Sequence, residues 1–509
     1  MEMKKTNLIL INYSKSLSEK LLEHCLNQKN INYLLLLDVQ KPARKYPFKI
    51  DFYNMETLHY GDYGENLSDF DPLDDITKNI IKTNESFLMK MMDRGEKPSK
   101  LISYQNKVMN NYKSKLLTSR TEFNYDLRKI ILNRHFRFWS HMIRDKKINF
   151  YYSLTIPHIV YDYIPYLICK NKRIKTLYTQ QVTYEGAQLN SSSIFDEYSE
   201  IKKKFKYNLK KYKTTKIKLS GNGEKYLHIM KEREKKKLFW NNKDAIDNFL
   251  YSKKKESYLL YFLKIFYLFF FRKSRNIQFY QIQRFFEKKY YLKNSEYKSY
   301  LSKITTNKLP KKRFVYFPLH MEPECSTVPM GGYNFDQLEV IDKLAFFTKK
   351  NKLILVVKEH PAQKSVGRSF EFYDEIIKNK NINFISTNYN SFEIISKSSG
   401  IITITGTTGW EGIFLKKPVM CLGNTPLKIA PSVFAPKKDD DYEFFFKNLD
   451  SIKKTNIQEI KIFFKTLEEF SIKAFIDHFE EGFDMFKSLE STPSKVAENF
   501  IKNLNSFIK

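Results

Sequence analysis

The sequence predicts an α/β protein with two doubly wound parallel sheets, because short β-branched runs alternate with helical patterns in two parts of the chain. One part lies before residue 200, where a β-α-β rhythm occurs twice. The other lies between Phe314 and Gly423, where apolar runs of strand length recur at helix-length intervals. The 509 residues suffice for two or three domains with full cores.

We expect residues 1–200 to form the first Rossmann-like domain. Its predicted strands are Asn7–Ile11, Tyr33–Leu37, Ile148–Ser153 and Ile174–Tyr178, and its clearest helices are Ser16–Leu26 and Ile159–Asn171. The polar stretch Tyr53–Lys100 predicts loops with one helix near Glu85–Met92, and Tyr104–Arg144 predicts long helices.

The second Rossmann-like domain is predicted over residues 311–435. Its strands are Phe314–Phe317, Leu353–Val357, Ile382–Ile385, Ile401–Ile404 and Val419–Leu422. They alternate with predicted helices Phe335–Thr348, Phe370–Lys378, Ser391–Ser398 and Trp410–Leu415. The tail, residues 436–509, is mostly helical and is predicted to pack back across the domains, with Asp439–Asp441 as a solvated turn. Two such domains with a cleft between them would form a GT-B-like architecture.

Residues 201–310 separate the two domains and read as a basic, aromatic, helical insertion. Ile201–Val315 carries 33 Lys and Arg against 8 Asp and Glu, so most of the net charge of +32 lies there. Such a block points to a membrane surface or an acidic polymer. No nucleic-acid fold signature accompanies the charge, so we predict no nucleic-acid partner. The abundance of Lys, Asn and Ile in the whole chain is equally consistent with an AT-rich genome.

The most apolar window, Tyr258–Phe271, is too short to cross a bilayer, which needs about 20 residues. Two interpretations stay open. The window is either a buried helix of the insertion, or an interfacial segment whose aromatic rings enter the headgroups while Lys253–Lys255 and Arg272-Lys273 meet anionic lipid. The 4 cysteines form no CxxC pair and the N-terminus lacks a signal-peptide core. We therefore expect a cytoplasmic protein, peripheral at the inner face of the cell membrane.

Two short signatures follow predicted strands of the second domain. They are Lys358-Glu359-His360-Pro361 and Thr405-Gly406-Thr407-Thr408-Gly409-Trp410-Glu411. In an open α/β sheet, ligands bind at the carboxyl ends of the strands, so both signatures are predicted to face one ligand. A His, several hydroxyls and the N–H groups at a helix start suit a phosphate, while the glycines permit close backbone approach.

A third strand-end segment is the loop Pro318–Asn334. It is rich in polar groups, of which Glu324, Ser326 and Thr327 are candidates for binding the same ligand. Each segment also has a purely structural interpretation. The loop Pro318–Asn334 could be a polar surface loop, and His360 could be a structural residue between a solvated Lys358 and a solvated Glu359. Thr405–Gly409 could be an ordinary strand-to-helix turn. Glu411 is placed either to stabilise the helix dipole or to hold a ribose or base.

The series PLHMEPECSTVPMGG, FDQL, VVKEHP and TGTTGWEGIFLKKPVMCLG resembles the bacterial capsule polysaccharide biosynthesis family, which includes transferases that build a lipid-linked β-Kdo primer. It is similar, more distantly, to bacterial sialyltransferases with an HP motif and a Ser/Thr motif. The resemblance implies a GT-B fold and a CMP-activated acid sugar, such as Kdo or a sialic-acid-like ulosonic acid. It also implies that His360, Thr405, Thr407 and Thr408 hold the nucleotide phosphate. No metal and no cofactor would then be needed. Glu359 stands where Kdo transferases of the family tend to have Gln.

A catalytic base is expected from the first domain, because an acceptor hydroxyl needs a carboxylate or His within hydrogen-bond reach. His158, Asp162 and Glu185 are the candidates. The sequence thus predicts a glycosyltransferase of surface polysaccharide synthesis that acts on a nucleotide sugar and a glycan or lipid-linked glycan acceptor. Two alternatives stay open: a non-catalytic capsule export or assembly factor, and a nucleotide-sugar epimerase of the same fold.

Overall fold

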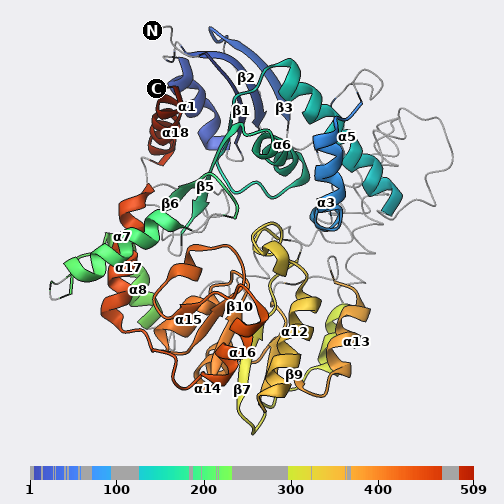
Figure 1. Cartoon of the computed structure of the whole chain (residues 1–509), viewed down its shortest axis with the longest axis vertical. Coiled ribbons are helices and arrows are strands. Elements are labelled where there is room, and N and C mark those ends of the chain that lie inside the picture. Colours follow the sequence, from blue (N-terminus) through green and yellow to red (C-terminus); the bar gives the residue numbers. More distant parts are fainter. Residues whose placement is uncertain are drawn as a thin grey trace, which may run out of the picture.

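The computed structural model describes residues 5–92, 125–231, 296–472 and 492–508, apart from short gaps at residues 13–14, 27, 29, 39–41, 43–44, 55–57, 59–62, 64–71, 183–186, 196–197, 214, 216, 323, 362 and 364–367. In this part of the chain each half of the molecule is built on its own sheet. The two sheets lie one above the other in Figure 1, with helices packed on both. The predicted α/β, GT-B-like fold is confirmed.

The first sheet has the strand order β13-β6-β5-β4-β1-β2-β3. Its strands are β1 Thr6–Ile11, β2 Ile31–Asp38, β3 Lys49–Asn54, β4 Phe150–Ser153, β5 Lys175–Gln181, β6 Gln188–Ser191 and β13 Ser471–Ile472. The run from β5 to β3 is parallel, whereas β6 pairs antiparallel with both β5 and β13. The sequence did not predict β3 and β6, because neither segment has the apolar run of a central strand.

The helices of the first half are α1 Lys15–Leu26, α3 Asp75–Met92, α5 Tyr125–Asp145 and α6 Val160–Asn171. The last three pack into one core with the sheet, through residues such as Leu88, Trp139 and Ile164. On the other face, α1 packs beside α18 Thr492–Ile508, so both ends of the described chain lie at this sheet. The helix predicted near Glu85–Met92 begins earlier than expected, at Asp75.

The second sheet has the order β12-β11-β10-β7-β8-β9 and is parallel throughout. Its strands are β7 Phe314–Pro318, β8 Ile354–Lys358, β9 Ile382–Ile385, β10 Gly400–Thr403, β11 Val419–Cys421 and β12 Val433–Phe434. The connecting helices are α12 Gln337–Lys350, α13 Phe370–Lys378, α14 Ser391–Lys397 and α15 Thr408–Phe414. Because β7 lies between β10 and β8, the three segments singled out in the sequence leave neighbouring strands at the same edge.

Asp439–Asp441 faces solvent as predicted, with the side chains of Asp439 and Asp440 76% and 82% exposed, but it is not a turn. These residues begin α16 Asp439–Lys447, and the Asp441 carboxylate accepts the backbone N–H groups of Lys437 and Lys438. Acidic side chains in a first helical turn satisfy free N–H groups and oppose the positive end of the helix dipole.

Helices of the predicted insertion and tail connect the halves. Among the described residues of 201–310 are α7 Ser199–Lys211, α8 Gly221–Lys231 and a helix at 296–304, while Tyr258–Phe271 lies outside them. The tail helix α17 Ile457–Phe470 packs against α7, and Phe205, Trp410 and Phe463 share one core. From α17 the chain returns to the first sheet through β13. The domain boundaries at 200, 310 and 435 stay a prediction. Of the helices described, none is long and apolar enough to span a membrane.

Candidate functional site

Hydrogen bonds join the three strand-end segments of the second sheet. The backbone N–H of Thr405 donates to Nε2 of His320 over 3.1 Å, and the Thr405 hydroxyl donates to the carbonyl of Ser326 over 2.8 Å. The N–H of Leu319 donates to the carbonyl of Lys358 over 2.9 Å. The loop after β7 therefore contacts both the turn after β8 and the turn after β10, as the strand order requires.

The turn after β10 is held from inside. The Gly406 N–H donates to Oγ1 of Thr403, and a Cβ at Gly406 would lie 2.9 Å from that oxygen and 3.0 Å from Nε2 of His320. Only glycine fits so close an approach. A hydroxyl can donate only one hydrogen bond. Because the Thr405 hydroxyl donates to the Ser326 carbonyl, it has no proton left to donate to a phosphate. Thr407 is exposed and Thr408 is half-buried, so their predicted contact with a phosphate stays a prediction.

His320 organises this turn, a role that the sequence did not assign to it. Its Nε2 accepts the Thr405 N–H, so that nitrogen carries no proton. His320 is 6% exposed, and burial, together with repulsion from Arg368 and from His360 when that ring is protonated, lowers its pKa to about 3. His320 is thus neutral at pH 7. The only signal in the sequence is that it follows a buried strand, as His360 does.

Lys358 and Glu359 are both buried, so the interpretation of solvated side chains is wrong for each. The Lys358 ammonium donates to the carbonyl of Tyr389 over 2.6 Å and to Oγ of Ser391 over 2.7 Å. Burial lowers the pKa of Lys358 to about 8, although the negative charge of Glu411 opposes the shift. Lys358 therefore contributes positive charge beneath the site and pairs electrostatically with Glu411, which is itself buried.

Glu359 belongs to a buried ionic cluster on the other side of the turn. Its carboxylate accepts from the guanidinium of Arg368 and from the hydroxyl of Tyr373. Although burial disfavours the charged form, the carboxylates of Glu359 and Glu322 hold the pKa of Arg368 above its usual range. Arg368 also donates to the His320 carbonyl, which ties the cluster to the first loop. The buried Glu359 carboxylate is thus accompanied by a cation that neutralises it.

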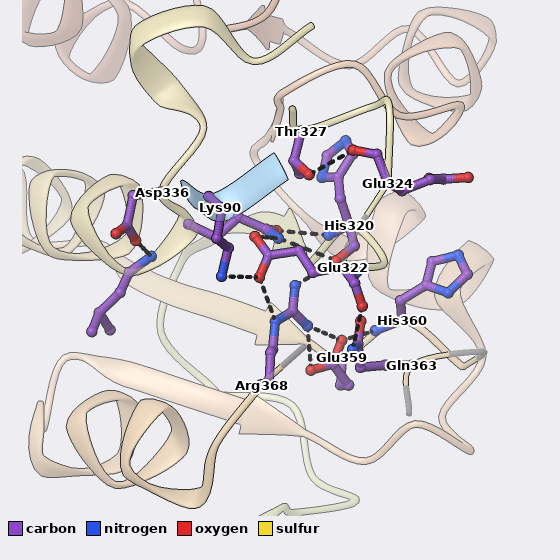
Figure 2. Close-up of polar contacts among 12 residues, drawn as sticks. Lys90, His320, Glu322, Glu324, Thr327, Asp336, Glu359, His360, Gln363 and Arg368 are labelled. Carbon is purple, nitrogen blue, oxygen red and sulfur yellow. Dashed lines mark hydrogen bonds and ion pairs between the residues drawn. The ribbon is translucent and has the colours of Figure 1, made fainter. Parts of the chain in front are cut away.

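His360 lies at the surface side of this cluster. In Figure 2 its ring points away from Arg368 and Glu322, while its backbone N–H donates to the carboxylate of Glu359. Burial lowers the pKa of His360 to about 4, and the positive charges of Arg368 and Lys358 lower it further. At pH 7 His360 is neutral, so one of its two ring nitrogens carries a proton. The two cations are themselves accompanied by carboxylates, Glu359 and Glu322 beside Arg368 and Glu411 beside Lys358.

The loop after β7 divides into buried and exposed groups. Thr327 is fully buried and its hydroxyl donates to the carbonyl of Glu324 over 3.0 Å, which makes it a structural residue of the turn. The Ser326 hydroxyl donates to the exposed carboxylate of Glu324 over 2.7 Å. Of the three residues predicted here, Glu324 and Ser326 face solvent and Thr327 does not.

The candidates from the first half lie at the start of α6. Asp162 is fully buried, and its Oδ1 accepts the backbone N–H groups of His158 over 2.9 Å and Ile159 over 2.8 Å. Burial raises the pKa of Asp162 well above its usual value. Asp162 therefore shapes the turn that carries His158, a partly exposed residue whose Nδ1 lies 2.5 Å from the Ile156 carbonyl. Glu185 lies outside the described residues. Among all the residues that the structure describes, there is no group of three or more His, Cys, Asp or Glu suited to a metal ion.

Residues 263–430 match the family model described as "Capsule polysaccharide biosynthesis protein". The resemblance to that family is confirmed over this part of the chain. No match was found among curated proteins.

Solved structures give weak likenesses. The β-Kdo 2,4 transferase of Thermosulfurimonas dismutans KpsC has 16% identity and a TM-score of 0.22, with 31% of this chain and 45% of that chain covered. The present chain thus spans less than half of that relative. The β-Kdo 2,7 transferase of the same protein has 12% identity and a TM-score of 0.27, covering 67% of this chain and 88% of that one. The UDP-GlcNAc 2-epimerase of Methanocaldococcus jannaschii has 10% identity and a TM-score of 0.26, covering 98% and 100%.

Proposed function

We propose that the protein is a glycosyltransferase of capsule or surface polysaccharide synthesis, and that the strand-end site of its second sheet binds the nucleotide of a sugar donor. The observation that carries this proposal is the convergence of three segments at one sheet edge, with His360, Thr407 and Thr408 on the accessible side and the cations Lys358 and Arg368 buried behind them. The family match over residues 263–430 supports a role in capsule synthesis.

The proposed donor is a CMP-activated acid sugar, as the resemblance implies. In the reaction an acceptor hydroxyl loses its proton and bonds to the anomeric carbon, while the bond from that carbon to the phosphate oxygen breaks. The nucleotide leaves with the negative charge. The N–H of His360 and the hydroxyls of Thr407 and Thr408 would donate to it and stabilise that charge. His158 is the base that we propose, since Asp162 is fully buried and holds the His158 turn.

A screen of CMP, UDP and GDP by thermal shift tests the donor site, because a ligand that binds the native state raises its melting temperature. We expect CMP to give the largest shift in the full chain and His360→Ala to remove it without lowering the melting temperature of the free protein. Equal shifts from all three nucleotides, or an unchanged shift in His360→Ala, would contradict the assignment.

Turnover separates the proposed activity from its rivals. With a CMP-activated acid sugar and an oligosaccharide acceptor, a transferase releases CMP only when the acceptor is present, and treatment with EDTA leaves the rate unchanged if no metal takes part. Isomerisation of a nucleotide sugar without acceptor would instead show an epimerase. Polymer binding without any nucleotide release would show an assembly factor.

Attachment to an anionic membrane through Tyr258–Phe271 belongs to the same proposal, because it would bring the site to a lipid-linked acceptor at the inner face of the cell membrane. Deleting residues 258–273 is expected to abolish co-sedimentation with phosphatidylglycerol vesicles. Undiminished co-sedimentation of the deletion variant would refute this part.

A further inference from the structure

One face of α3, which belongs to the first half, docks on the loop after β7. Nζ of Lys90 lies 3.4 Å from Oε2 of Glu322, and the ring of Phe87 meets that of Phe335 edge-on at 5.4 Å between centroids. Residues three apart share a helix face, so both contacts come from the same side of α3. The loop in turn places Val328 in the core of the first half. Residues 322–335 are thus held by both halves of the molecule.

The ionic cluster under the site is balanced only when Lys90 is counted. Glu322 and Glu359 are two carboxylates whose side chains are 3% and 0% exposed, and Arg368 is one fully buried cation. Figure 2 shows Lys90 and Arg368 approaching the same oxygen of Glu322 from different directions. A buried carboxylate with too few cations is strongly unfavourable. Lys90 supplies the second positive charge from outside the second half.

Glu322 is also coupled to every segment of the candidate site. Its N–H donates to Oε1 of Gln363, whose Nε2 donates back to its carbonyl, so it is fixed to the segment that follows His360. The side-chain amide of Gln337 donates to Oε1 of Glu322 over 2.8 Å and to the carbonyl of His320 over 3.2 Å. A displacement of Glu322 would therefore shift His320, which holds the Thr405 turn.

We propose that Lys90 is a positioning residue supplied by the first half: it completes the charge of the Glu322–Arg368–Glu359 cluster, so the strand-end site takes its ordered form only when α3 is docked. The coupling between α3 and the loop is independent of the chemistry at the site. Its consequence for donor binding rests on the proposed function. Lys90 pairs with Glu322, which is not among the residues proposed to touch the nucleotide, so it acts through Glu322.

Hydrogen exchange measured by mass spectrometry on the full chain tests the coupling without any substrate. Lys90→Met is expected to speed exchange in peptides covering residues 318–334 by about tenfold, because the cluster keeps an excess negative charge. Lys90→Arg keeps the cation and should exchange as the wild type does. Lys78→Met is the matched control on the same helix, since Lys78 forms an exposed pair with Asp75.

The double variant Lys90→Met with Glu322→Gln tests whether Lys90 orders the loop through its positive charge or through the packing of its side chain. It removes one carboxylate with the lysine, so the remaining Arg368–Glu359 pair is balanced and exchange should return to within about threefold of wild type. Exchange that is unchanged in Lys90→Met, or that stays fast in the double variant, would overturn the proposal.

Nucleotide affinity is then measured by calorimetry with CMP. We expect Lys90→Met to weaken binding by about tenfold and the double variant to recover most of it. If the exchange results hold but no variant, the wild type included, binds a nucleotide, the proposed function fails while the coupling stands. If the wild type binds CMP and Lys90→Met binds it equally well, Lys90 has no positioning role.

Discussion

The turn after β8 and the turn after β10 are fixed by different forces. Behind the first lies a buried ionic cluster in which Arg368 joins Glu359 to Glu322. Behind the second lies a set of hydrogen bonds between neutral groups, in which His320 accepts from Thr405 and Thr403 accepts from Gly406. Ionic support makes the first turn sensitive to the loss of any one charge, whereas close packing makes the second sensitive to shape and to protonation of His320.

The largest effect is expected from Arg368→Met. It leaves two buried carboxylates without their shared cation, which costs about 3 to 5 kcal/mol when one partner of a buried pair is removed. Urea denaturation measures the free energy of unfolding. Adding Glu359→Gln to Arg368→Met should recover a large part of the loss, and a double variant as unstable as the single one would show that packing, not charge, is what Arg368 supplies.

Acid should destabilise both turns. The pKa values of His320 and His360 are lowered to about 3 and about 4, so below pH 6.5 the unfolded chain binds protons that the folded chain does not. Stability is therefore complete above pH 6.5 and is lost as the pH falls, by about 2 kcal/mol for each histidine between pH 7 and pH 5. Denaturation curves at pH 7 and pH 5 measure this loss. In the His320→Gln variant one of the two histidines is absent, so the loss between the two pH values should be about half of that in the wild type.

The turn after β10 is tested by a pair of substitutions at His320. His320→Phe removes the acceptor of the Thr405 N–H and should cost about 1 to 2 kcal/mol, since a partly buried donor is left unsatisfied. His320→Gln keeps an acceptor and should cost less. Equal losses for the two variants, measured by urea denaturation at pH 7, would mean that ring packing outweighs the hydrogen bond.

A smaller effect separates the threonines. Thr407→Val and Thr408→Val should each weaken CMP binding about fivefold, because each removes one hydroxyl donor, worth about 1 kcal/mol. Thr405→Val should act on stability instead, since its hydroxyl is given to the Ser326 carbonyl. Calorimetry with CMP measures the affinity of the three variants. If Thr405→Val weakens CMP binding as much as the other two substitutions do, the separate role given to Thr405 is wrong.

The sequence predicted five of the six strands of the second sheet, because their β-branched runs are buried on both faces and stand out from the helices between them; the two-residue edge strand β12 was missed. His360 and the Thr405–Gly409 turn were found for the same reason, since each directly follows such a run. The edge strand β3 was missed, as it lacks that pattern.

The supporting residues could not be predicted in the same way. Arg368 and Lys90 meet Glu322 only after folding, and nothing in the local pattern marks a buried charge. Glu359 and Thr327 looked like ligand-binding residues because sequence position fixes the edge of the sheet on which a residue lies, but not the direction of its side chain.

In the proposed function His360 meets the phosphate of the donor nucleotide. An NMR titration of the His360 ring, free and with CMP, tests this contact. We predict a pKa near 4 for the free protein, rising when the phosphate is bound, because a nearby negative charge favours the protonated ring. A His360 resonance that titrates identically with and without saturating CMP would contradict the claim.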